Sequence, residues 1–281
     1  MQDFMYPYVP PAVFSMEVKD SDIFITLQDK GSQRVIFTGT TLTPEEEKHL
    51  EAFRQYLKEA KKVFPEWVDD KDRLILRFLQ GNKFHYEKTL KSLEEHIEWR
   101  INSLPVDSEE IEELAKSGII YFFGRDKGYR PVLHINVKKM IDANLPNETL
   151  VRLGIFILEF GLKNLFVAGK VETMIVVIDM TDVGTISIPV SSLKTISEML
   201  QNNYRARLYK QYILNTPFLV KGIWAIVKGF LEEFTVAKIN ILGSDYTPLY
   251  EQVDKAQLEK RLGGTHENIE EDFFPPQIPS E

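Results

Sequence analysis

Residues 174–179 read Met-Ile-Val-Val-Ile-Asp, and this short run decides the fold class. It is rich in β-branched residues and lacks the alternation of a strand with one solvent-exposed face. It therefore predicts a strand that is buried on both faces, which is typical of parallel sheets covered by helices. Three further runs of this kind are Pro131–Val137, Gln211–Asn215 and Lys238–Leu242.

Helical patterns separate these runs, at Glu148–Val167, Ser191–Tyr204 and Phe218–Phe234. The alternation of strand and helix predicts an α/β fold with a mostly parallel sheet and right-handed crossovers. The stretch at 148–167 is apolar nearly all round, so we expect this helix to be buried on several sides. Ordinary core packing and the lining of a cavity both explain such a helix.

Residues 1–42 precede this pattern and have a different character. Residues 1–14 are rich in Pro, Tyr and Phe, which favours an extended arm lying on the body of the protein. Two short runs follow, Ile23–Leu27 and Arg34–Thr38, with the polar stretch Asp29–Ser32 between them. This arrangement predicts a β-hairpin.

A helical subdomain is predicted next. Thr43 is suited to cap a helix, Pro44 to occupy its first position and Glu46 to complete a capping box. Pro65 and the stretch Gly81–Phe84 divide the helical pattern that follows into several short helices. The expected organisation is an arm and hairpin (1–42), a helical subdomain (43–117), a sheet domain (118–270) and an extended Pro-rich tail (271–281).

The composition excludes several classes of function. The net charge of −8 argues against nucleic-acid binding through overall positive charge. The sequence has no cysteine, so thiolate catalysis and thiolate metal sites are ruled out. No segment approaches the roughly 20 apolar residues of a spanning helix, and the N-terminus lacks the features of a signal peptide. We therefore expect a cytoplasmic protein whose contact with membranes is peripheral.

Recognised catalytic motifs are missing from the predicted strand ends. The sequence has no G-x-G-x-x-G after a strand, no P-loop and no G-x-S-x-G nucleophile elbow. The five His residues are scattered and none forms H-E-x-x-H. Asp179 is the best isolated catalytic candidate, although an acidic residue at a strand end more often orders the following loop. We expect no catalytic residue, no cofactor and no metal ligand.

Six motifs occur in an order typical of one family. They are Leu76–Phe84 with Trp99-Arg100, Gly124–Val132, Met174–Asp179, Tyr204–Leu208 with Ile213–Pro217, Thr235–Ile239, and Leu262–Gly264. Together they resemble the CRAL-TRIO family, and within it the phosphatidylinositol/phosphatidylcholine transfer branch, over about residues 45–270. The resemblance implies a carrier whose sheet floors a pocket for one lipid and whose gate helix closes the mouth of that pocket.

The resemblance also implies roles for particular residues. The positions that match the family's inositol-phosphate site are Arg77, Arg207, Thr235 and Lys238. The expected lining of the acyl pocket comprises Phe156, Phe160, Met174, Val176 and Ile178. The expected gate helix and membrane contact comprise Lys221, Ile223, Trp224, Val227, Lys228, Phe230 and Leu231. An apolar helix with a basic edge suits a membrane surface, although a fixed core helix with two solvated lysines has the same pattern.

Two departures from the family's pattern bear on the ligand. Ala206 stands where the family has an acidic residue that bonds inositol hydroxyls. Met174 and Val176 stand where relatives that bind phosphatidylcholine carry hydroxyl side chains. We therefore predict phosphatidylinositol rather than a choline lipid as ligand, with a membrane surface as a transient partner.

Other interpretations of the same pattern stay open. A sterol, tocopherol or retinoid carrier would need an equally apolar pocket, but such ligands have no phosphate to match Arg77, Arg207 and Lys238. Residues 1–42 favour an added regulatory role or a protein partner, so the chain would then present a lipid-loaded domain in signalling. An enzyme is a third interpretation, and it lacks any assembled site.

Overall fold

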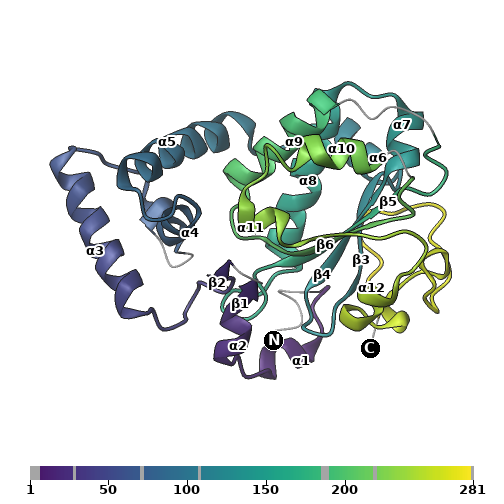
Figure 1. Cartoon of the computed structure of the whole chain (residues 1–281), viewed down its shortest axis with the longest axis horizontal. Helices are drawn as coiled ribbons and strands as arrows, with labels where there is room; N and C mark the ends of the chain where they lie inside the picture. Colours follow the sequence, from purple (N-terminus) through teal and green to yellow (C-terminus); the bar gives the residue numbers. More distant parts are fainter. Residues whose placement is uncertain are drawn as a thin grey trace.

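The computed structural model describes residues 7–27, 30–69, 73–106, 109–184, 190–217 and 220–279, without the side chains of residues 69, 190–192, 220, 221 and 223. Residues 44–103 form a helical body that stands beside a larger body built on a sheet (Figure 1). The N-terminal segment lies against the sheet body, beneath the strands in that view.

Five strands form the larger sheet. They are β3 (Ile120–Arg125), β4 (Pro131–Asn136), β5 (Met174–Asp179), β6 (Leu208–Leu214) and β7 (Ile239–Ile241). They lie in that order; β4 to β7 run parallel, and β3 pairs antiparallel with β4. The predicted α/β fold with a mostly parallel sheet is therefore confirmed. The edge strand β3 was not predicted; it reaches β4 through a short turn, as an antiparallel neighbour can.

One row of paired residues crosses the sheet from β4 to β7. Leu133 pairs with Val176, Val176 with Gln211, and Gln211 with Ile239. Because paired residues in neighbouring strands point to the same face, these four side chains share one face of the sheet. The opposite face packs against residues 249–262 near the C-terminus.

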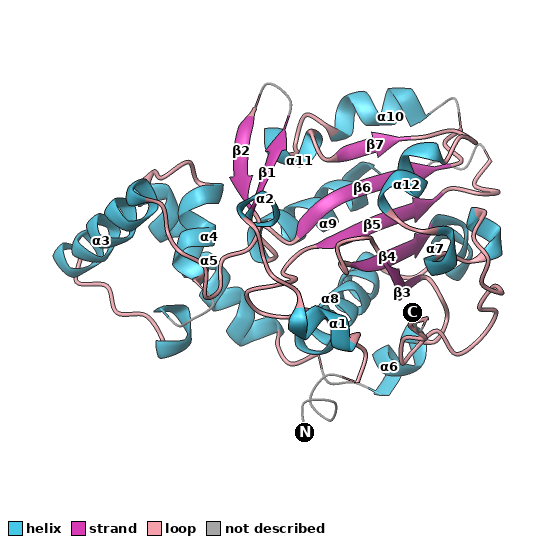
Figure 2. Cartoon of the chain, turned by 90° about the horizontal axis from the view of Figure 1, so that it is seen from below, coloured by secondary structure: helices cyan, strands magenta, loops and turns pink. Residues whose placement is uncertain are grey.

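Helices cover both faces, as the doubly buried strands require. The face that carries the row lies against α8 (Asn147–Asn164), α9 (Val190–Asn203) and α10 (Val220–Val227), and α12 (Thr247–Gln252) lies on the opposite side (Figures 1 and 2). Shorter helices are α6 (Glu109–Ala115), α7 (Val137–Ala143), α11 (Glu233–Val236) and the 3-10 turns Glu66–Asp69, Lys255–Gln257 and Lys260–Leu262.

The helical body contains α3 (Pro44–Glu59), α4 (Leu74–Gly81) and α5 (Tyr86–Ser103). The predicted capping box is present at the start of α3. The hydroxyl of Thr43 accepts a hydrogen bond from the N–H of Glu46 at 3.2 Å, and the Glu46 carboxylate accepts one from the N–H of Thr43 at 2.9 Å. Two backbone donors that a helix start would otherwise leave unpaired are thereby satisfied.

The N-terminal segment contains α1 (Pro11–Ser15), α2 (Asp20–Ile23), β1 (Phe24–Leu27) and β2 (Gly31–Arg34). A hairpin is present, but its second strand is Gly31–Arg34 rather than the predicted Arg34–Thr38, so it includes residues that were expected to connect the two strands. The arm is not extended throughout, because Pro11 opens a short helix whose Val13 is fully buried. The Arg125 guanidinium holds the arm by donating to the carbonyl of Tyr8 at 2.8 Å.

The prediction of one continuous helix at 218–234 is wrong. α10 and α11 are separate elements, and the chain turns between them. The N–H of Gly229 bonds to the carbonyl three residues back, a tightening typical of a helix end, and glycine is a poor helix former. Phe230 and Leu231 therefore lie in the link between the two helices rather than on a gate helix.

Candidate functional site

An apolar cavity of about 330 Å³ lies between the sheet and the helices α8, α9 and α10. Met174, Val176 and Ile178 alternate along β5 and form part of its floor. Apolar side chains of the three helices form its walls: Leu150, Val151, Leu158, Leu193, Ile196, Met199, Leu200, Trp224 and Val227. The structure therefore brings together three of the five residues expected to line an acyl pocket.

The four residues expected to bind phosphate also line this cavity. Arg77 belongs to α4, Arg207 immediately precedes β6, Thr235 belongs to α11 and Lys238 immediately precedes β7. These side chains gather at the amino ends of the parallel strands. Open α/β sheets usually bind ligands at the carboxyl ends of their strands, so this polar set occupies the less usual end.

Arg77 forms a buried ion pair with Glu172, and the two side chains are 1% and 2% exposed. The Glu172 carboxylate also accepts hydrogen bonds from the backbone N–H groups of Phe37, Thr38 and Gly169 at 2.8–2.9 Å. Burial raises the pKa of Glu172, but Arg77 and these N–H groups outweigh burial, so this pKa lies below its ordinary value. The Arg77 guanidinium also lies over the ring of Phe37, 4.1 Å from its centroid.

Lys238 is 5% exposed, and its ammonium donates to the carbonyl of Leu208 at 2.9 Å. Burial lowers the pKa of Lys238 to about 8, and the Glu232 carboxylate opposes that shift. Because this ammonium is poorly solvated, an anionic ligand stabilises its charged form more than it would stabilise that of a surface lysine. Thr235 lies close by in the chain, where its carbonyl accepts the N–H of Lys238 at 3.1 Å.

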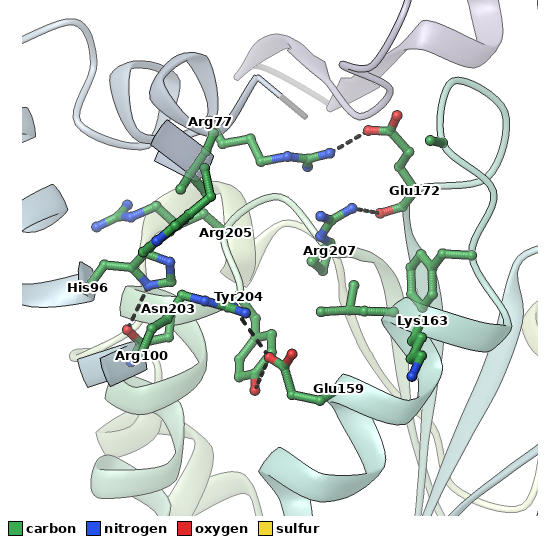
Figure 3. A pocket seen from close by; sticks show the side chains of 15 residues that line it. Arg77, His96, Arg100, Glu159, Lys163, Glu172, Asn203, Tyr204, Arg205 and Arg207 are labelled. Carbon is green, nitrogen blue, oxygen red and sulfur yellow. Dashed lines mark hydrogen bonds and ion pairs between the residues drawn. The ribbon is translucent and has the colours of Figure 1, made fainter. Parts of the chain in front are cut away.

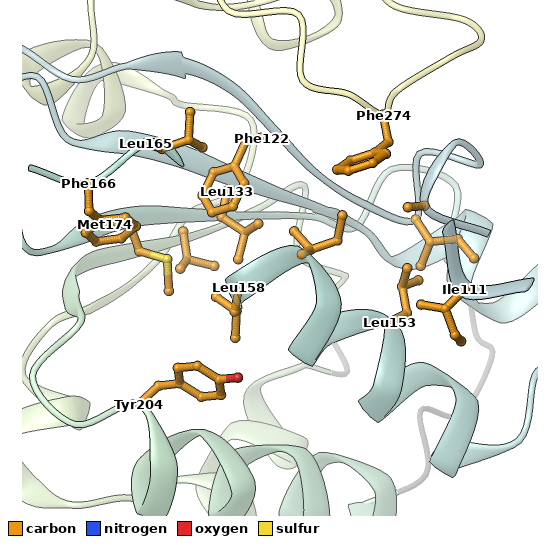
Figure 4. Packing of buried hydrophobic residues seen from close by; sticks show 14 residues of the cluster. Ile111, Phe122, Leu133, Leu153, Leu158, Leu165, Phe166, Met174, Tyr204 and Phe274 are labelled. Atoms are coloured by element: carbon orange, nitrogen blue, oxygen red, sulfur yellow. The ribbon is translucent and has the colours of Figure 1, made fainter. Parts of the chain in front are cut away.

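Two of the residues predicted to line the acyl pocket do not line the cavity. Phe156 and Phe160 on α8 pack edge-on against Phe274, with ring centroids 5.1 and 4.9 Å apart. Figure 4 shows Phe274 reaching α8 from the C-terminal segment. The structure thus places these two side chains against the C-terminal segment, and an all-apolar helix gives no sign in the sequence of which of its faces meets a cavity.

The predicted gate residues divide into three groups. Trp224, Val227 and Leu231 line the cavity. Lys228 is exposed, and Phe230 lies in the link, where its carbonyl accepts a hydrogen bond from Gln201 at 3.2 Å. The side chains of Lys221 and Ile223 lie outside the described part of the structure.

The structure adds polar residues that the sequence did not single out. Gln33 from the hairpin, Gln80 from α4 and Arg205 line the polar end of the cavity together with Ala206. Arg205 belongs to the motif Tyr204–Leu208, so its positive charge could have marked it in the sequence as a candidate for the polar end of the cavity. Gln33 lies in the segment that the family resemblance does not cover, and no pattern marks it.

A second cavity, of about 570 Å³, lies between the helical body and α8 (Figure 3). Its walls are polar and apolar in about equal parts. They hold Arg100, Glu159 and Tyr204 in one network, in which Glu159 accepts from Tyr204 at 3.1 Å and lies 3.5 Å from Arg100. His96 contacts Asn203 at 3.0 Å, and burial lowers the pKa of this His to about 4. The walls of the smaller cavity are mostly apolar and suit acyl chains better than these mixed walls, so the smaller cavity is the candidate site.

Asp179 orders the loop after β5. Its carboxylate accepts from the N–H of Thr181 at 2.9 Å and from the Asn215 amide at 3.0 Å. Among the described residues, no group of three or more acidic or His side chains is arranged to hold a metal ion. Within the same ranges, every helix is too short or too polar to cross a membrane.

An α/β body with an apolar pocket that is cationic at one end defines a class of protein that accommodates an amphipathic ligand. Comparison with known proteins identifies the family. The profile of the CRAL/TRIO domain matches residues 115–264, and the chain belongs to this family.

The chain is similar to several known proteins. It is 30% identical to the Sec14 cytosolic factor of Schizosaccharomyces pombe, over 69% of this chain and 74% of that protein. It is 29% identical to the phosphatidylinositol/phosphatidylcholine transfer protein SFH7 of Arabidopsis thaliana, over 76% of this chain but only 43% of the relative. It spans 46% of a CRAL-TRIO domain-containing protein of Schizosaccharomyces pombe at 27% identity. The crystal structure of Sfh5 superposes with a TM-score of 0.60 at 20% identity, over 75% of this chain and 85% of that one, and shows the same fold.

Proposed function

We propose that the protein binds one phospholipid in the apolar cavity and carries it between membranes without covalent chemistry. One observation carries this proposal: the apolar floor on β5 and the polar set Arg77, Arg207, Thr235 and Lys238 line a single cavity. Burial of acyl chains contributes about 0.8 kcal/mol per methylene, which supplies affinity. The cationic donors at the other end match a phosphate. Such a carrier works from the cytoplasm and touches membranes only at their surface.

Phosphatidylinositol is the ligand that we propose. Its phosphodiester is anionic and its ring hydroxyls exchange hydrogen bonds with polar side chains. A choline headgroup instead brings a positive charge toward Arg207 and Lys238, and the floor residues Met174 and Val176 offer it no hydroxyl. The Arabidopsis relative is named as a phosphatidylinositol/phosphatidylcholine transfer protein, which supports a phospholipid as the ligand.

We propose that helix α10 is the wall of the cavity that moves to admit the lipid. A volume of about 330 Å³ is at the low end of the roughly 300–1,000 Å³ of ligand pockets, so a two-chain lipid needs additional room. The helix has eight residues, packs against α9 and contributes Trp224 and Val227 to the cavity. Its Ile226 is 54% exposed, and this outward apolar side chain supports contact with a bilayer surface.

A carrier of sterol, tocopherol or retinoid is the main competing proposal. Those ligands would use the same apolar walls, but they would bring no anionic group to the buried Lys238. Vesicle assays separate the two. We expect the protein to accelerate the transfer of labelled phosphatidylinositol from donor to acceptor vesicles, and to move phosphatidylcholine more slowly. A protein that moves cholesterol or retinol but neither phospholipid contradicts the proposal.

A further inference from the structure

The β1–β2 hairpin forms a roof over the polar end of the cavity. Gln33 of β2 lines the cavity together with Arg77, Thr235 and Lys238. Figure 2 shows the hairpin standing beside α11, between the helical body and the edge strand β7. The hairpin precedes the residues that match the family profile.

The roof is held on two sides. Toward α4, the N–H of Arg34 donates to the side-chain carbonyl of Gln80 at 3.0 Å, and the Gln80 amide donates back to the Arg34 carbonyl at 3.1 Å. Toward α11, Lys30 forms an ion pair with Glu233. The helices that the roof joins are those that carry Arg77 and Thr235, so the hairpin spans the polar set.

A buried arginine fixes the base of the roof. The Arg34 side chain is fully buried and donates to both oxygens of the Glu46 carboxylate at 2.6 and 2.5 Å. Its remaining N–H groups reach Thr40 and the carbonyls of Ile36 and Thr41 at 2.9–3.2 Å. A bidentate pair of this kind has a fixed geometry, which sets the position of the neighbouring Gln33.

The side-chain oxygen of Gln33 is buried, and no donor among the described residues hydrogen-bonds to it. A buried acceptor of this kind raises the free energy of the folded state until a donor reaches it. The neighbouring polar groups Arg77, Arg207 and Lys238 are cations, which donate hydrogen bonds and suit a phosphate. Ala206 lines the same end and offers no polar side chain.

A phosphodiester carries no donor for the Gln33 oxygen, whereas a ring hydroxyl is one. We propose that Gln33 recognises the polyhydroxylated headgroup. Its amide oxygen accepts a hydrogen bond from a ring hydroxyl, while the cations Arg77, Arg207 and Lys238 of the same cavity bind the phosphate. The hairpin is thereby a specificity element of the lipid site. This inference rests on the proposed function and adds the residue that distinguishes an inositol lipid from a bare phosphate lipid.

The test compares phosphatidylinositol with phosphatidylmethanol, an anionic phosphodiester lipid that has no ring and no hydroxyl donor. Vesicles that contain one or the other lipid are titrated with the full-length wild type, with Gln33→Leu and with Gln33→Glu. The leucine variant has a similar size without hydrogen bonding, and the glutamate variant keeps an acceptor. Ser32→Ala, on the exposed neighbour in the same strand, is the matched control.

We expect Gln33→Leu to weaken phosphatidylinositol binding by about three- to tenfold, the range for one hydrogen bond to a buried group, and to leave phosphatidylmethanol binding unchanged. Gln33→Glu and Ser32→Ala should retain the preference of the wild type. Equal effects of Gln33→Leu on both lipids, or no effect on either, overturn the role of Gln33 while the proposed function stands. A wild type that binds phosphatidylmethanol but not phosphatidylinositol overturns the proposed ligand and the role of Gln33 together.

Discussion

Arg77 on α4 and Glu172 just before β5 form an ion pair that is almost wholly withdrawn from solvent. The same carboxylate accepts N–H groups from Phe37 and Gly169, so one acid joins the helical body, the residues after the hairpin and the sheet body. The pair thus supports the edge of the lipid cavity, which Arg77 lines.

Removal of one member of this pair should destabilise the fold. Arg77→Met leaves the Glu172 carboxylate buried without its cation, a change that typically costs about 3–5 kcal/mol. We expect the free energy of unfolding in urea to fall by that amount, and the double variant Arg77→Met with Glu172→Gln to recover part of it. A loss below about 1 kcal/mol for Arg77→Met would show that the pair does not join the two bodies.

The low pKa of Lys238 predicts opposite effects of pH on binding and on stability. As pH rises through about 8, the folded protein loses this positive charge, so binding to phosphatidylinositol vesicles should weaken by up to about tenfold per pH unit. The unfolded chain keeps the proton up to the ordinary pKa of 10.5, so the Lys238 contribution to the free energy of unfolding should rise over that interval.

Lys238→Met is the control for both measurements, because it removes the titrating group. We expect this variant to bind weakly at pH 7 and to lose the pH-dependent step above pH 8. If the variant and the wild type have the same binding profile between pH 7 and pH 9, Lys238 does not face the ligand.

Hydroxyl groups on the cavity floor should widen the choice of ligand. Met174 and Val176 point into the cavity, so Met174→Ser with Val176→Thr places two hydroxyls beside the bound lipid. We expect this double variant to gain phosphatidylcholine transfer while phosphatidylinositol transfer continues. The single variant Ile178→Val, which adds no hydroxyl on the same strand, should keep the lipid preference of the wild type. An unchanged preference in a folded double variant would place the choline lipid elsewhere.

The exposed Ile226 on α10 should matter for transfer rather than for binding. Ile226→Glu puts a negative charge on the outer side of the helix, where it disfavours contact with an anionic bilayer. We expect transfer between anionic vesicles to slow several-fold while the amount of lipid carried by the purified protein stays unchanged. Val63→Glu alters a residue that is 94% exposed in the loop after α3, and it should leave both quantities unchanged. Equal transfer by the two variants would argue against α10 as the membrane-facing wall.

The sequence predicted the central strands well, because the Ile/Val run of β5 and the capping box of Thr43 are local signals with few alternatives. It missed β3, since Ile-Tyr-Phe-Phe-Gly-Arg is an antiparallel edge strand in a chain whose other strands follow a parallel pattern. It also joined α10 to α11, because a nearly continuous apolar run obscured the turn at Gly229.

The candidate site was only partly predictable. Arg77, Arg207 and the neighbouring pair Thr235 and Lys238 come from three segments that lie apart in the sequence. Before the fold was known, only the family resemblance indicated that they belong to one site. Gln33 could not be found in this way, because its role depends on where the hairpin packs. Phe156 was predicted to line the acyl pocket, and it packs against Phe274. Hydrophobicity alone does not say which side of α8 meets a cavity and which side meets Phe274.

Identification of the lipid that co-purifies with the full-length protein tests the central claim most directly. The protein is purified without detergent, its intact mass is measured under native conditions, and the extracted lipid is identified by mass spectrometry. We predict one phospholipid per chain, with phosphatidylinositol dominant. The double variant Arg207→Gln with Lys238→Gln should lose this lipid, whereas the control variant Lys210→Gln, on β6, should keep it. An extract that contains only a sterol or a retinoid would contradict the account.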